Sequence, residues 1–193
     1  MKSEETVLSL RYSEIGPEDI DAISTMTERY LTHGHYIRRA ITREASRHNY
    51  YGVKVQDGEQ MVGFLTFKEG IDFTLPHAAL ERKIRDMTAG GMVVNGDAVF
   101  VNPAYRKGGL GGEMMRRSLS MMRAMGAKYL LLEFWIYPDM KIPALYLPDA
   151  NLHILYEERL ERFYRDLPRY GMSCPICGAE CKCGALIRLF SLS

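Results

Sequence analysis

The 193-residue sequence lacks the features that mark secreted, membrane-spanning or nucleic-acid-binding proteins. No apolar run approaches the roughly 18 residues of a membrane span, and the polar residues 1–5 do not begin a signal peptide. The 25 basic and 24 acidic residues give a formal charge of +1, whereas nucleic-acid-binding proteins normally carry a basic surplus. We therefore expect a cytoplasmic protein that binds neither nucleic acid nor membrane.

Cysteine is absent until residue 174, and all four cysteines then follow closely: Cys174, Cys177, Cys181 and Cys183. A secreted disulfide framework would distribute its bridges over the fold. The Cys-x2-Cys pair followed by glycine is typical of a zinc knuckle, but the second pair, Cys-x-Cys, departs from that pattern. Structural zinc, reduced thiols or a local disulfide, and an iron–sulfur site therefore stay open. A metal held by four thiolates would be structural, because no position is left for a substrate.

Internal repeats and low-complexity segments are absent too, so we expect one domain over residues 1–193, with a cysteine-rich hairpin at 173–184. Asp57-Gly58 is a strong hairpin-turn signal between two apolar segments. Periodicity and turn residues predict a mixed α/β (α+β) sheet with helices. The expected strands are 6–12, 51–56, 61–67, 97–101, 129–136 and 185–190, and the expected helices are 17–31, 33–49, 78–87, 110–125 and 151–167.

The most informative segment is 99–115, where a strand runs into a glycine-rich turn and directly into an amphipathic helix. The unsatisfied N–H groups of a first helical turn, together with the helix dipole, favour an anion there. Glycines let a phosphate approach the backbone, and Arg106 and Lys107 add positive charge at the rim. The spacing fits neither the P-loop nor the dinucleotide-binding pattern.

Arg106-x-x-Gly109-x-Gly111, preceded by Val101-x-Pro103, resembles the acetyl-CoA signature of the GNAT superfamily of N-acetyltransferases. The order of elements is similar to that family from about residue 6 to 172. The resemblance implies a central mixed, mostly antiparallel sheet flanked by helices, with the fourth and fifth strands splayed apart. It also implies acetyl-CoA as co-substrate, bound by the turn and by the fourth strand. The residues expected to contact it are Val99, Phe100, Val101, Arg106, Lys107, Gly108, Gly109, Leu110, Gly111 and Gly112.

The resemblance further implies direct attack of an amine on the thioester, with a primary amine of a small molecule or a peptide as acceptor. Tyr164 is the candidate acid for the departing thiolate, by its place late in the last predicted helix, although Pro168 stands where the family usually has glycine. Tyr156 is the alternative, and Tyr164 could instead be a core residue. Asp97, which opens the predicted fourth strand, and Glu133, inside the fifth, are candidate bases. A carboxylate in an apolar strand such as that of Glu133 must be paired, neutral or facing a cleft, and a position at an edge or on the surface explains it equally well.

A function of another class fits the same residues: a CoA-binding protein without transfer activity that acts through its cysteine-rich hairpin as an interaction module. The identity of the acceptor is expected to depend on the segments 33–49, 71–91 and 138–150, because binding residues concentrate in loops on a rigid scaffold. The sequence does not decide between a monomer and a homodimer.

Overall fold

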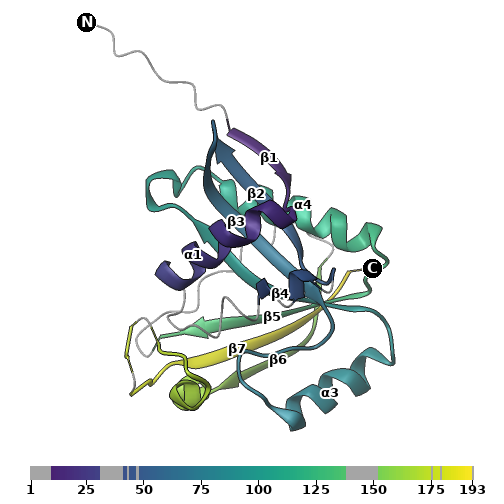
Figure 1. Ribbon diagram of the computed structural model, residues 1–193. Helices are drawn as coiled ribbons and strands as arrows, with labels where there is room; N and C mark the ends of the chain where they lie inside the picture. The colour runs from purple at the N-terminus through teal and green to yellow at the C-terminus, as the bar shows by residue number, and fades with distance from the viewer. Residues whose placement is uncertain are drawn as a thin grey trace, which may run out of the picture.

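The computed structural model describes residues 10–30, 41–42, 44–46, 48–137, 152–174, 176–178 and 180–192 (Figure 1). Within these residues the strands are β1 (Leu10–Glu14), β2 (Tyr51–Asp57), β3 (Gln60–Glu69), β4 (Val93–Val101), β5 (Tyr129–Ile136), β6 (His153–Leu160) and β7 (Gly184–Ser191). They form a seven-stranded sheet in the order β1-β2-β3-β4-β5-β7-β6. The last strand of the chain, β7, therefore lies inside the sheet, and β6 forms its edge.

Among the described strand pairs, β4 and β5 alone are parallel. They pair only over Val93–Asn95 and Tyr129–Leu131. Beyond these residues β4 continues along β3, whereas β5 continues along β7, and the two halves of the sheet part (Figure 1). This confirms the mixed, mostly antiparallel sheet with splayed fourth and fifth strands.

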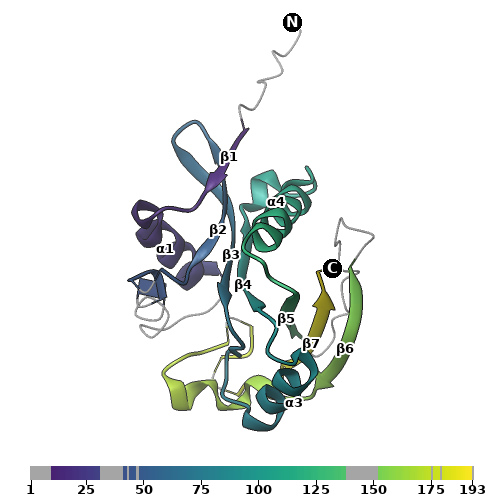
Figure 2. The same ribbon diagram turned by 90° about the vertical axis from the view of Figure 1, so that its right-hand side faces the viewer.

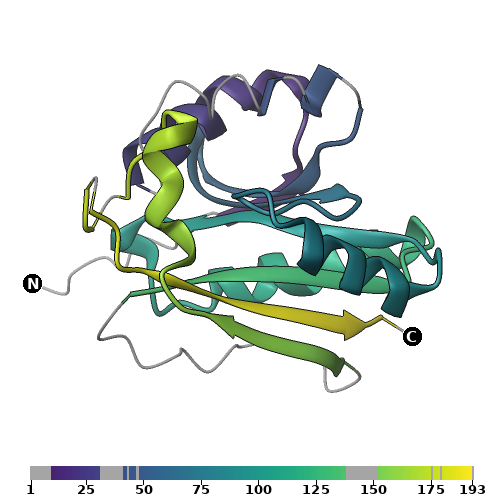
Figure 3. The same cartoon turned by 90° about the horizontal axis from the view of Figure 1, so that it is seen from below.

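The α-helices are α1 (Ile20–Tyr30), α3 (Ala78–Thr88) and α4 (Leu110–Ala124), and the 3-10 segments are η1 (Pro17–Asp19), η2 (Pro103–Tyr105) and η3 (Phe163–Tyr170). The apolar side of α4 packs on one face of the sheet through Met114, Leu119 and Met122. α1 covers the opposite face (Figure 2). α3 and η3 lie on the same face as α1, over β5 and β7 (Figure 3). No helix of the described part of the chain is long and apolar enough to cross a membrane.

The local patterns identified most of these elements correctly. The hairpin turns at Asp57-Gly58, where Gly58 has a φ of +59°. The predicted helices at 78–87 and 110–125 and strands at 129–136 and 185–190 match α3, α4, β5 and β7 closely. The predicted strands at 51–56 and 61–67 match β2 and β3, and that at 97–101 is the second half of β4. Helix 17–31 appears as η1 followed by α1.

The first strand, predicted at 6–12, lies at β1, and residues 6–9 are outside the described residues. Of the predicted helix 33–49, residues 41–42 and 44–46 are helical and residues 33–40 lie outside the described part. The predicted loop 138–150 lies outside it as well.

The predicted last helix, 151–167, is wrong. Its first half is β6 and its second half belongs to η3, while Asn151, its predicted cap, lies outside the described residues. β6 pairs with β7 from His153↔Ser191 to Leu160↔Ala185. β7 is buried almost throughout, so its backbone groups on that edge need hydrogen-bond partners. This long-range pairing outweighs the helix propensity of the leucine, glutamate and arginine residues in the segment, because propensity is a weak determinant that tertiary contacts override.

Candidate active site

The loop after β4 turns the chain into α4. Pro103 opens η2, and the side chain of its N-cap Asn102 accepts a hydrogen bond from the Ala104 N–H at 3.1 Å. Gly109 then takes a left-handed conformation with a φ of +78°, which glycine adopts without strain. The helix therefore begins immediately after a tight, well-defined turn.

The start of α4 offers uncovered backbone amides. Its first hydrogen bond runs from the Glu113 N–H to the Gly109 carbonyl at 3.0 Å. The N–H groups of Leu110, Gly111 and Gly112 precede this bond, so they have no acceptor within the helix. They also lie at the positive end of the helix dipole, which favours an anion.

The space beside Gly111 and Gly112 is open. A Cβ atom added at Gly112 would meet nothing within 4 Å, and one at Gly111 would meet only Val101 Cγ2 at 4.0 Å. The fold itself therefore does not need glycine at either position, but a phosphate close to the backbone does. Arg106 and Lys107 are exposed at the rim, and Arg106 Nε donates to the Val101 carbonyl at 3.0 Å. These residues fit the pyrophosphate of CoA.

Other residues predicted to contact CoA have different surroundings. The Leu110 side chain is buried in the core and leaves only its backbone to a ligand. A Cβ atom at Gly108 would lie 3.3 Å from Leu110 Cδ1, so glycine there also serves packing. On β4, Phe100 points into the core beneath α1, whereas Val99 is 52% exposed beside the splay.

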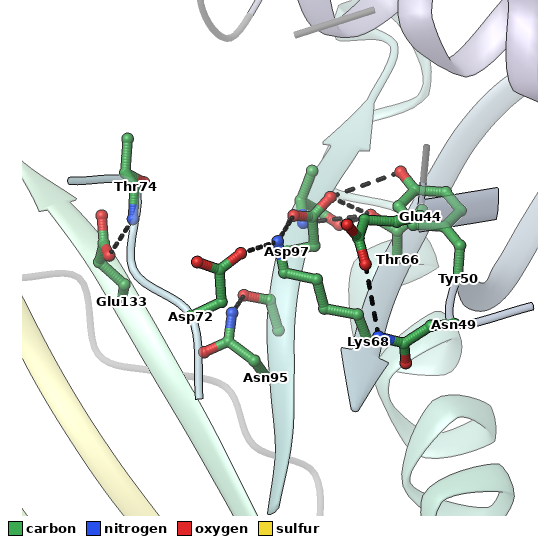
Figure 4. A network of polar contacts seen from close by, with 12 residues as sticks. Glu44, Asn49, Tyr50, Thr66, Lys68, Asp72, Thr74, Asn95, Asp97 and Glu133 are labelled. Atoms are coloured by element: carbon green, nitrogen blue, oxygen red, sulfur yellow. Dashed lines mark hydrogen bonds and ion pairs between the residues drawn. The ribbon is translucent and has the colours of Figure 1, made fainter. Parts of the chain in front are cut away.

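A carboxylate and a phenol meet on the face opposite α4. The Tyr164 hydroxyl donates to Glu133 Oε1 at 2.5 Å. The Thr74 N–H donates to Glu133 Oε2 at 3.0 Å (Figure 4). Burial raises the pKa of the Glu133 carboxyl, although both hydrogen bonds oppose this effect. Burial and the neighbouring carboxylate raise the pKa of the Tyr164 phenol, so this hydroxyl keeps its proton. The structure thus brings two of the predicted catalytic residues into direct contact.

Asp97, the third predicted catalytic residue, lies on β4 (Figure 4). Its Oδ1 pairs with Lys68 Nζ at 3.3 Å, and its Oδ2 accepts hydrogen bonds from the Tyr50 hydroxyl at 3.4 Å and the Thr66 hydroxyl at 3.3 Å. Lys68 Nζ also pairs with Asp72 Oδ2 at 2.5 Å. Burial lowers the pKa of Lys68, but the two carboxylates outweigh it and raise the pKa overall.

Sequence reasoning missed the partners of these carboxylates. Thr66 and Lys68 stand two residues apart in the otherwise apolar strand β3 and face the same side as Asp97. Polar residues alternating in a buried strand are a usable signal, because they need partners. Thr74 contributes only its backbone N–H, which no pattern of residue types could have indicated. Tyr156, the alternative acid, contacts Glu158 and Lys83 rather than Glu133.

The four cysteines form a compact group between η3 and β7. All four Sγ atoms lie within 4.8 Å of one another. The Sγ atom of Cys183 lies 3.8 Å from that of Cys174 and 3.6 Å from that of Cys177. Cys174, Cys181 and Cys183 are buried and Cys177 is half-buried, and all four are free thiols. Folding therefore gathers both cysteine pairs at one point.

Comparison with known proteins agrees with the fold. Residues 19–146 match the model of the acetyltransferase (GNAT) family, and the chain belongs to that family. The match ends before Tyr164 and before the cysteines. Since the structure also has no last helix at 151–167, the role predicted for Tyr164 is not supported by an alignment with the family and depends on its contacts.

Solved structures share the fold at low sequence identity. Arabidopsis thaliana NAA60 in complex with acetyl-CoA has a TM-score of 0.66 and 14% identity over 95% of this chain and 98% of that chain. The same protein with a bisubstrate analogue has a TM-score of 0.65 and 14% identity over 95% and 98%. The ribosomal-protein-S18-alanine N-acetyltransferase from Escherichia coli has a TM-score of 0.57 and 15% identity over 95% and 94%. No curated protein sequence matches the chain.

Proposed function

We propose that this protein is an N-acetyltransferase that moves the acetyl group of acetyl-CoA to a primary amine of a small molecule or a peptide. The observation that carries the proposal is the open, glycine-lined space in front of the first amides of α4, beside two strands that part. Membership of the GNAT family supports it. Acetyl-CoA complexes of proteins with the same fold support it as well.

Acetyl-CoA would bind along the splay. The amides of Leu110, Gly111 and Gly112 would hold the pyrophosphate, with Arg106 and Lys107 at the rim. The backbone of β4 from Val99 to Val101 would pair with the pantetheine arm, because β5 leaves β4 after Asn95↔Leu131. The bound co-substrate would supply a thioester carbonyl for attack.

Direct attack requires a group that takes a proton from the acceptor ammonium. Glu133 suits this role better than Asp97, because burial raises its pKa above that of an ordinary glutamate, and a raised pKa makes a carboxylate a stronger base. Asp97 is held by an ion pair with Lys68 and by two hydroxyl donors. We assign Glu133 as the base.

Tyr164 is suited to carry that proton onward. Its hydroxyl already donates to Glu133. When Glu133 takes a proton from the amine, Tyr164 can give its own proton to the departing thiolate and receive one from Glu133. The ammonium thus loses one proton, the thiolate gains one, and both residues return to their starting states.

The carboxylates also favour a cationic acceptor. Figure 4 shows Asp72 between Glu133 and the Lys68–Asp97 pair. The charge of Asp72 acts on Glu133 in the direction that raises its pKa. A protonated amine placed here would be attracted to the group that is to deprotonate it.

The test measures thiol release from acetyl-CoA with a panel of primary amines, together with the melting temperature with and without acetyl-CoA. We expect stabilisation by acetyl-CoA and amine-dependent thiol release. Glu133→Gln should keep the stabilisation and lose the turnover. Stabilisation without thiol release for any amine would favour the CoA-binding protein that acts through its cysteine-rich hairpin. Absence of both would refute the proposed function.

A further inference from the structure

We propose that Cys174, Cys177, Cys181 and Cys183 bind one structural zinc ion, and that this ion fixes η3 so that Tyr164 meets Glu133. The inference concerns a site outside the family match, which ends at residue 146. The metal site itself does not depend on the proposed transfer activity.

The distances between the sulfur atoms support the binding of one zinc ion. A zinc ion surrounded by four thiolates at about 2.3 Å requires sulfur atoms about 3.8 Å apart, the edge of that tetrahedron. Cys183 Sγ lies 3.8 Å from Cys174 Sγ and 3.6 Å from Cys177 Sγ. All four sulfurs lie within 4.8 Å of one another, and none of the thiols is in a disulfide. Two separate disulfides would not require the four sulfurs to converge on a single point.

Backbone N–H groups are directed at the cysteine sulfurs, as hydrogen-bond donors usually are at a site made of thiolates. Four thiolates and one Zn²⁺ carry a net charge of −2, and buried charge needs compensating N–H groups. The Cys177 N–H lies 3.4 Å from Cys174 Sγ, within the turn closed by the Gly178 N–H and the Cys174 carbonyl at 3.0 Å. The backbone N–H groups of Lys182 and Cys183 are directed at other thiols of the cluster.

Trp135 supplies an independent observation. Its indole Nε1 is buried and has no hydrogen-bond partner among the described residues. Among the groups around it, the Trp135 side chain interacts with the Cys183 thiol. A neutral thiol is a weak acceptor, whereas a metal-bound thiolate is a strong one. The buried donor is therefore explained if the cysteines are ionised on a metal.

The connection to the catalytic pair runs through the same residues. The ring of Trp135 stacks on that of Tyr164, with centroids 3.8 Å apart and planes at 12°. The Tyr164 N–H also donates to the Cys183 carbonyl at 3.4 Å. η3 is a 3-10 segment with Pro168 inside it, and such helices are weak on their own. Anchoring the cysteine loop therefore anchors Tyr164.

Zinc fits this donor set better than the other metals considered. The site is closed, largely buried and made of thiolates alone, which is the pattern of structural zinc. Iron also accepts four thiolates, so the measurement must distinguish the two metals.

The first measurement determines zinc and iron per chain by plasma emission in untagged protein, followed by titration of the reduced apoprotein with Zn²⁺. We expect one zinc and no iron. Co²⁺ loading should produce the absorption bands of tetrahedral thiolate coordination. It should also quench the fluorescence of Trp135, the single tryptophan of the chain. Iron in the purified protein, or failure of the apoprotein to take up Zn²⁺, would overturn the proposal.

Variants separate the metal from its setting. Cys181→Ser should lose the zinc and lower the melting temperature, whereas Glu180→Gln, in the same loop, should keep both. Trp135→Phe retains an aromatic ring to stack on Tyr164 and removes only the N–H. We expect its zinc affinity to fall about 10- to 100-fold, the usual effect of losing a group that hydrogen-bonds a ligand. Zinc retained in Cys181→Ser would contradict the four-cysteine site.

The proposed effect of zinc on the position of Tyr164 can be measured separately from metal binding. Zinc removal should change the Trp135 emission and lower thiol release, while stabilisation by acetyl-CoA persists, since Leu110 of the turn and the cysteines belong to different core clusters. Full turnover in the metal-free protein would refute the positioning role. If no amine were acetylated at all, the proposed function would fail, but the metal content and the fluorescence would still test the site.

Discussion

Replacing Gly111 by valine is the most direct test of the proposed phosphate site at the start of α4. A Cβ atom at this position meets only Val101 Cγ2, at 4.0 Å, so the valine side chain enters open space. In the free protein the substitution should be harmless. The helix propensity of valine is better than that of glycine by about 0.3 kcal/mol, so the melting temperature should hardly change.

The effect on acetyl-CoA binding should be large. An isopropyl group at residue 111 would occupy the place of the phosphate oxygens and separate them from the amides of Gly111 and Gly112. A hydrogen bond to a charged group is worth about 1.5–3 kcal/mol, so the loss of two costs about 3–6 kcal/mol. The Kd for acetyl-CoA should rise roughly 100- to 10,000-fold.

Isothermal titration with acetyl-CoA measures this Kd directly. Ser120→Val, on the exposed side of the same helix, introduces the same side chain away from the turn and should bind as the parent does. If Gly111→Val bound acetyl-CoA as tightly as the parent, the glycine-lined space would not be the phosphate site. A large fall in the melting temperature of the variant would also contradict the reasoning, because the space would then not be open.

Three further predictions concern the pair Glu133–Tyr164 and a buried ion pair. Tyr164→Phe keeps the ring and removes the donor, so kcat and kcat/KM should fall together by about 10²–10⁴-fold. Glu133→Gln should be inactive yet more stable than the parent at neutral pH. Burial disfavours the charged carboxylate of Glu133, as its raised pKa indicates, and the neutral amide avoids this cost. Lys54→Met leaves Asp19 buried and unpaired, at 9% side-chain exposure, which should cost about 3–5 kcal/mol and lower the Tm by about 6–20 °C.

Each of these three predictions has a control measurement. Unchanged acetyl-CoA affinity in Tyr164→Phe separates a catalytic loss from damage to the turn, and unchanged turnover would remove Tyr164 from the mechanism. The stability contributed by Glu133 is present below the pKa of an unfolded glutamate, about 4.3, and is lost as the pH rises through its raised value in the fold. Glu133→Gln should therefore flatten the fall of Tm from acid to neutral pH. Asp19→Asn added to Lys54→Met should recover part of the lost stability, since no charge is then left unpaired.

Much of the glycine-rich turn into α4 could be predicted because its determinants are local. The glycines of 108–112, the 3.6-residue period of α4 and the apolar run of β5 act over a few residues each. The hairpin at Asp57-Gly58 is local for the same reason. The helix predicted over 151–167 was wrong because the partner that decides its conformation, β7, lies about one helix and one loop further along the chain.

The contact between Glu133 and Tyr164 shows the same limit. The sequence indicated Glu133 and Tyr164 separately, the first as a carboxylate in an apolar strand and the second by its place in a predicted helix of which only the 3-10 segment η3 is observed. Their contact spans 31 residues. It depends on η3 lying over β5, and Lys68 and Asp97 likewise meet only because β3 and β4 are neighbours.

By itself, therefore, the sequence determined the strand–turn–helix that would hold acetyl-CoA, the hairpin and the gathering of cysteines near one point of the chain. Only the tertiary structure decided that β7 inserts between β5 and β6, that Tyr164 donates to Glu133, and that four sulfurs converge beside Trp135. The physical reason is the separation along the chain between the residues that interact. Turn geometry and helix periodicity are set by neighbouring residues, whereas strand order and the burial of polar groups depend on contacts between segments that no local pattern specifies.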